Sequence, residues 1–187
     1  MKPWQGRLVG CVLTMSVAAG LTSCTEPEPQ RIPSPTPTVS SPSPSRVTSP
    51  TPSAEELDLR GAEQAVSRFW RVIDRLSADP DSDLTELTTV SRGSVAAQWA
   101  RNINQDRYDR VTSTGNVVVR KATAARTKER NVYSVTACID VSKIEVTDKN
   151  GKSVVPADRP PRVAYDYILN KDQQKWYVVK ERVTGTC

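Results

Sequence analysis

The sequence contains no histidine among its 187 residues. Histidine is the commonest general base near neutral pH, and it activates the nucleophile in Ser-His-Asp and Cys-His systems. Its absence excludes those systems. The sequence also has no glycine-rich phosphate loop and no paired spacing typical of metal ligands. We therefore predict that the protein is not an enzyme, that it needs no cofactor and that it holds no metal.

A long apolar run is also missing. The apolar stretch at residues 8–21 carries no charge but has only about fourteen residues, fewer than the roughly 20 that a membrane-spanning helix needs. Lys2 and Arg7 precede it, as basic residues precede the apolar core of a secretory signal peptide. Small residues then lead directly to Cys24. The pattern predicts a signal peptide over residues 1–23.

The four residues Leu21, Thr22, Ser23 and Cys24 resemble the lipobox of bacterial lipoproteins. In such proteins, a signal peptidase cuts before the cysteine, whose sulfur receives a diacylglyceryl group. The resemblance implies that Cys24 is the lipid attachment site and that the protein is held on the extracytoplasmic face of the cell membrane. Two acyl chains give stable anchoring where one is marginal, because each buried methylene adds about 0.8 kcal/mol. The alternative is an ordinary cleaved signal with an incidental cysteine.

Residues 25–53 hold nine of the fourteen prolines, with serine and threonine between them. Proline fixes φ and removes a backbone donor, so neither helix nor sheet is expected there. We interpret residues 24–53 as the lipidated cysteine followed by a disordered Pro/Ser/Thr-rich linker. At about 3.1 Å per residue, it would span roughly 90 Å when extended. The alternative is an O-glycosylated stalk.

Residues 54–187 are long enough for one folded domain with its own core. This part carries 22 basic and 19 acidic residues, a net charge of +3, and we expect no binding to nucleic acid. Its densest basic run is interpreted as a solvated hairpin, with a phosphate-binding patch as the alternative. The run consists of Arg120, Lys121, Arg126, Lys128 and Arg130.

The domain contains two cysteines, Cys138 and Cys187. Outside the membrane such a pair usually forms a disulfide. The loop that it would close has about 49 residues, for which the chain-entropy model gives roughly 4 kcal/mol of stabilisation. Two free thiols or a metal site remain the alternatives.

Apolar residues recur at helical spacing over residues 54–77, after a capping box formed by Ser53 and Glu56. Shorter helical segments are predicted around 84–87 and 91–106. After residue 109 the apolar period changes to two, which predicts strands at 116–123, 131–141, 143–147, 162–169 and 175–183. Turns are predicted at 148–151 and 170–174. Helices followed by antiparallel strands predict an α+β domain in which the helices pack on one face of a curved sheet.

This order of elements resembles the NTF2-like, cystatin-like cone fold, and in particular the small NTF2-like lipoproteins of actinobacteria. Four features carry the resemblance: Cys138-Ile139-Asp140, the turn Asp148–Lys152, the strand at Trp176–Val179 and the terminal Cys187. The resemblance implies a cone-shaped domain in the cell envelope. It implies no activity.

Five aromatic residues are candidates for lining such a cone: Trp70, Trp99, Tyr133, Tyr165 and Trp176. An aromatic-lined cone would bind a small apolar or amphipathic ligand; the alternative is that these side chains fill the core. Asp166 stands between two tyrosines, but neighbours on a strand point to opposite faces, so it is expected on the surface. The preferred interpretation is a non-catalytic domain that binds an envelope protein partner, and the small-ligand module is its alternative.

Overall fold

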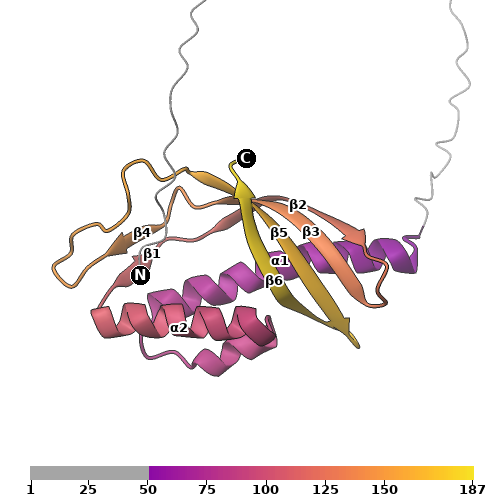
Figure 1. Ribbon diagram of the computed structural model, residues 1–187, viewed down its shortest axis with the longest axis horizontal. Coiled ribbons are helices and arrows are strands. Elements are labelled where there is room, and N and C mark those ends of the chain that lie inside the picture. Colours follow the sequence, from indigo (N-terminus) through magenta and orange to yellow (C-terminus); the bar gives the residue numbers. More distant parts are fainter. Residues whose placement is uncertain (1–50) are drawn as a thin grey trace, which may run out of the picture. The chain divides into compact units, whose positions relative to one another are not determined.

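The computed structural model describes residues 51–187 (Figure 1). The predicted signal peptide, Cys24 and all but the last three residues of the predicted linker lie outside this range. No helix within it is both long and apolar enough to cross a membrane. The elements are α1 (Ala54–Ala78), η1 (Leu84–Thr89), α2 (Gly93–Asp109), β1 (Thr112–Thr114), β2 (Val118–Arg126), β3 (Val132–Asp140), β4 (Glu145–Thr147), β5 (Arg162–Asp172) and β6 (Lys175–Gly185).

Helix α1 begins at the predicted capping box. The backbone N–H of Ser53 donates to the Glu56 carboxylate at 2.7 Å, and the Ser53 hydroxyl accepts from the Glu56 N–H. This arrangement satisfies two backbone donors that would otherwise lack partners. The helix ends at Ala78, before Pro80. Its apolar side is buried from Ala62 onward: Ala62, Ala65, Val66, Phe69, Trp70, Val72, Ile73 and Leu76.

Four antiparallel strands form the main sheet in the order β2-β3-β5-β6, and β1 and β4 form a separate two-stranded sheet. Alternate residues of β3 are buried beneath α1, from Tyr133 to Ile139, which defines the inner face of the sheet. In Figure 1, α1 runs behind the main sheet and α2 lies near the lower part of β6, away from its C-terminal end. Helices packed against one antiparallel sheet confirm the predicted α+β class.

The predicted helices are all present, with ends shifted by a few residues, and the turn at Asp148–Gly151 is confirmed. Two details of the sheet were predicted wrongly. The β5–β6 turn contains only Gln173 and Gln174, because the cross-strand pairing continues to Asp172 and Lys175. The strand at Thr112–Thr114 was missed, since a three-residue strand shows too few alternations to be recognised; it pairs with β4.

Arg107 joins α2 to the end of α1. Its Nη2 atom donates to the carbonyl oxygens of Asp79 at 3.1 Å and Ser82 at 2.9 Å, and to the Ser82 hydroxyl at 2.7 Å. The loop after α1 has backbone acceptors with no helical partner, and a guanidinium can satisfy several at once. The side chain therefore holds the connection between the first two helices.

Replacing Arg107 with alanine should lower the free energy of unfolding by about 2 kcal/mol, because part-buried carbonyls lose a charged donor. Arg101→Ala, at an exposed position of the same helix, is the matched control and should change it by less than about 0.5 kcal/mol. Urea unfolding of both variants measures the difference. Equal midpoints for the two would show that the Arg107 contacts contribute nothing.

Candidate functional site

The five candidate pocket residues lie inside the domain and contact one another. The Trp70 ring packs edge-on against Trp99 at 5.6 Å and against Tyr165 at 5.8 Å between ring centroids. Tyr133 and Trp176 form a second edge-on pair at 4.8 Å. Edge-to-face contacts at these distances are favourable packing for aromatic rings. The side chains thus form two packed groups within the core.

Several polar atoms of the aromatic groups form hydrogen bonds within the domain. The Trp70 indole N–H donates to the Tyr167 hydroxyl at 2.9 Å, and the Tyr133 hydroxyl donates to Asp58 at 2.9 Å. Trp176 lies so close to α1 that a Cβ on Gly61 would be 2.9 Å from its indole nitrogen. A glycine inside a helix costs stability, and here it makes room for the indole. These residues fill the interior.

Glu181 is a buried carboxylate that the sequence analysis did not identify. Its Oε1 atom accepts from the Trp99 indole N–H at 2.8 Å, whereas its buried Oε2 atom has no hydrogen-bond partner in the described part of the chain. A one-residue register shift separates the pairs Leu169–Val178 and Ile168–Lys180. This bulge at Val179 reverses the faces of the residues after it. A strict alternation from Val178 would have placed Lys180 inside and Glu181 outside.

Burial raises the pKa of Glu181, and the hydrogen bond from Trp99 offsets part of this rise. Tyr165 and Tyr167 also have raised pKa values because of burial, so both remain neutral. A carboxylate that has left water without a full set of donors destabilises the fold when it is charged. The charged form of Glu181 therefore destabilises the contact between α2 and β6.

Glu181→Gln should stabilise the domain at neutral pH by about 1 kcal/mol, because the amide keeps the acceptor for Trp99 without a buried charge. The sign follows from linkage: a raised folded pKa makes the carboxyl destabilising above that pKa and harmless below about 4.3, the unfolded value. The advantage of the variant should therefore vanish as the pH falls to about 4. Thermal unfolding between pH 4 and 8, with Glu145→Gln as an exposed control, measures it. A pH-independent difference would contradict this account.

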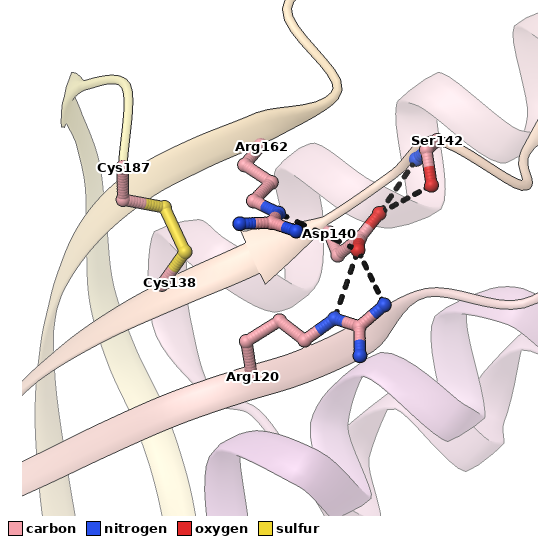
Figure 2. Close-up of polar contacts among 6 residues, drawn as sticks. All are labelled: Arg120, Cys138, Asp140, Ser142, Arg162 and Cys187. Carbon is pink, nitrogen blue, oxygen red and sulfur yellow. Dashed lines mark hydrogen bonds and ion pairs between the residues drawn. A yellow bond between two sulfur atoms is a disulfide. The ribbon is translucent and has the colours of Figure 1, made fainter. Parts of the chain in front are cut away.

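On the outer face of the sheet, Asp140 lies at the centre of a cross-strand charge cluster (Figure 2). Arg120 of β2 binds its Oδ2 atom at 2.8 Å, and Arg162 of β5 lies 3.7 Å from the same atom. The Ser142 hydroxyl and N–H donate to Oδ1 at 2.6 and 3.0 Å. The hydrogen bonds from Ser142, with that from Arg120, hold the pKa of Asp140 well below its usual range. The cluster ties three strands together.

Cys138 and Cys187 are joined by a disulfide at the same end of the sheet (Figure 2), with their Cα atoms 5.8 Å apart. The bond attaches the end of the chain to β3. Beside the disulfide lies a shallow depression between the start of β5 and the C-terminus, lined in part by Pro161, Arg162 and Cys187. In residues 51–187, no group of three or more cysteine or carboxylate side chains is placed to hold a metal ion.

The middle of the outer face carries an open groove across β3, β5 and β6. It is lined by Ser134 and Thr136, by Asp166 and Ile168, and by Lys180 and Arg182, together with the strand backbones. Asp166 faces outward, as the alternation predicted, and accepts from Arg182 at 2.8 Å. Among the described residues, Ile168 is the one outward-facing apolar side chain of the groove, and hydroxyl and charged groups surround it.

The outer face is basic. In the part of this face away from the β5–β6 turn, the carboxylates Asp140 and Asp166 both lie in ion pairs. Its five cationic side chains outnumber them, and two of these, Lys121 and Lys180, take part in no ion pair among the described residues. The cationic side chains are Arg120, Lys121, Arg162, Lys180 and Arg182. The predicted hairpin is confirmed for the basic run Arg120–Arg130, because these residues lie on β2 and in the turn that joins it to β3.

No protein-family model matches this chain, and no curated protein matches it. Solved structures do match. The intermembrane-space region of the chloroplast protein ARC6 has 15% sequence identity and a TM-score of 0.50, over 68% of this chain and 97% of that one. CagV, a VirB8 homolog of the T4SS from Helicobacter pylori, has 12% identity and a TM-score of 0.42, over 68% of this chain and 99% of that one. The likeness concerns the fold alone, and this chain has the NTF2-like α+β fold that its sequence resemblance implied.

Proposed function

We propose that this protein is a membrane-anchored, extracytoplasmic lipoprotein whose NTF2-like domain binds an envelope protein partner without catalysing a reaction. One observation carries the proposal. The interior of the domain is filled by aromatic side chains, whereas the outer face of β3, β5 and β6 presents an open, basic groove. A surface of this kind can contact a partner without any rearrangement of the core.

The filled interior weighs against the alternative of a small ligand in the cone. Trp99 and Tyr165 both pack on Trp70 where such a ligand would have to lie. An enzyme with an Asp–Tyr pair is also disfavoured, because Asp166 and the ring of Tyr167 lie on opposite faces of β5. The carboxylate of Glu181 faces inward and accepts a hydrogen bond from the Trp99 indole.

The charge of the outer face suggests the kind of partner. Lys121 and Lys180 lack carboxylate partners within the described residues, so an acidic protein surface would neutralise them on binding. Complementary charges at the rim raise the rate of association and favour the right partner over others. Ile168, in the middle of the groove, supplies an apolar contact. We therefore expect an acidic surface with an apolar centre.

The location in the envelope follows from the predicted lipobox and linker. A tether of roughly 90 Å would let the domain reach a partner while Cys24 stays in the membrane. The matching region of ARC6 belongs to an intermembrane space, so this fold occurs beside membranes elsewhere. That comparison is an analogy of location and assigns no partner.

Lipidation can be tested by growing the native host with an alkyne analogue of palmitate and coupling a fluorophore to the purified chain. Label is expected in the wild type and in Cys11→Ala, whose cysteine lies within the predicted signal peptide. Cys24→Ala should carry no label, because no other thiol becomes the first residue after cleavage. Equal labelling of Cys24→Ala would rule out the lipobox interpretation.

The partner surface can be tested with a photo-crosslinking residue at Thr136, in the outer groove, and at Gln98, exposed on α2, as the control. Irradiation of intact cells should give one discrete adduct from position 136 and none from position 98. The double variant Lys121→Glu/Lys180→Glu should reduce this adduct about tenfold or more, because it reverses the unpaired charges.

The matched control for the double variant is Lys149→Glu/Lys152→Glu, which makes the same charge change in the turn after β4. This control should leave the adduct intact. The same adduct from both crosslinking positions, or equal loss in both double variants, would show that the outer groove is not the partner surface.

A further inference from the structure

Helix α1 borders a second groove, which we call the α1 groove. It consists of two adjoining depressions that share Arg68 and Thr89. One depression is lined by Gly61, Gln64, Arg68, Thr89, Gln174, Lys175 and Trp176. The other is lined by Arg68, Arg71, Val72, Arg75, Thr89 and Val90. The α1 groove thus follows one stripe of the helix and is closed on its other side by the end of η1 and the β5–β6 turn.

Cationic side chains are concentrated along this groove. Arg68, Arg71 and Arg75 recur at spacings of three and four residues, which places them on one side of the helix. Lys175 adds a fourth positive charge from the β5–β6 turn. Of these four cationic side chains, only Arg75 forms an ion pair within residues 51–187, with Glu86. The groove therefore carries an excess of three positive charges.

Such an arrangement is unfavourable for the free protein. Like charges on neighbouring turns of a helix repel each other, and Arg68 is half-buried, so water screens its charge less. Burial and the neighbouring Arg71 lower the pKa of Arg68, because both make its positive charge less favourable. A bound anion would relieve it. The α1 groove also offers neutral hydrogen-bonding side chains, namely the amides of Gln64 and Gln174 and the hydroxyl of Thr89.

We propose that the α1 groove binds an extended polyanion that carries several phosphate groups, with Arg68 and Arg71 as its main ligands. A guanidinium presents two parallel N–H donors that match the oxygens of a phosphate group. The eleven residue steps from Gln64 to Arg75 correspond to about 16 Å of helix, long enough for more than one phosphate. The cationic side chains, together with the amides of Gln64 and Gln174, fit a phosphodiester or polyphosphate chain.

This site is distinct from the proposed partner surface. The outer groove is built from β3, β5 and β6, whereas the α1 groove is built from α1, the end of η1 and the β5–β6 turn. The phosphate-binding role that the sequence analysis left open for the run from Arg120 to Arg130 is better placed here. In that run, Arg120 already binds Asp140. The two proposals can therefore fail separately.

The test is calorimetric titration of the full chain with short-chain inorganic polyphosphate at low salt. Saturable binding is expected. Arg68→Gln/Arg71→Gln should weaken it by about ten- to a hundredfold, since the two guanidinium groups would supply charge-assisted hydrogen bonds to the phosphates. Lys128→Gln/Arg130→Gln makes the same change of charge in the β2–β3 turn and should weaken it less than about threefold.

A second variant distinguishes paired hydrogen bonds to phosphate from attraction between charges alone. Arg68→Lys/Arg71→Lys keeps both charges but removes the paired donors, and should still weaken binding about tenfold. Thermal unfolding of each variant shows whether the fold is intact. Unchanged affinity in the lysine variant, or equal loss in the glutamine variant and its control, would overturn the proposal.

Anionic vesicles of phosphatidylglycerol form the other arm of the experiment, with phosphatidylcholine vesicles as the neutral comparison. Binding to polyphosphate with little binding to vesicles supports the proposed ligand. Binding to phosphatidylglycerol alone would overturn it and assign the groove to the membrane surface. Failure of all three probes to bind would also overturn it, and would leave the partner proposal for the outer face unaffected.

Discussion

The packing of α1 against the inner face of the main sheet is the constraint on which the rest of the domain depends. The buried side of the helix and the alternate residues of β3 and β5 form one core cluster. Once they pack together, the opposite sides of both elements must face outward. The arginine stripe of α1 and the basic outer face of the sheet therefore both follow from the same hydrophobic contact.

The aromatic residues determine what kind of interior this contact encloses. The sequence left open whether the interior would be an open cone. In the structure, the Trp70 ring packs edge to face against Trp99 and Tyr165 and fills the space between helix and sheet. The single phenylalanine, Phe69, completes the group. A filled interior shifts the chemistry of the domain to its surfaces, where charged side chains and open grooves are found.

Charge is distributed over these surfaces in an uneven way. Carboxylates such as Asp140 and Asp166 are used in cross-strand ion pairs, which leaves lysines and arginines in excess at both grooves. A net charge of only +3 for residues 54–187 conceals this separation, because acidic residues are plentiful elsewhere. Two basic grooves on different elements suit a domain that contacts more than one acidic component of its surroundings.

The sequence by itself determined the α+β class, the capped helix α1, the approximate positions of the longer strands and the outward position of Asp166, because these depend on local periodicity and turn residues. Tertiary structure decided what local patterns do not encode. A bulge at Val179 turned Glu181 inward and Lys180 outward, and a three-residue strand found its partner in β4. Whether five aromatic residues line a cavity or fill it depends on how closely the helices approach the sheet, which is set by packing between residues far apart in the chain.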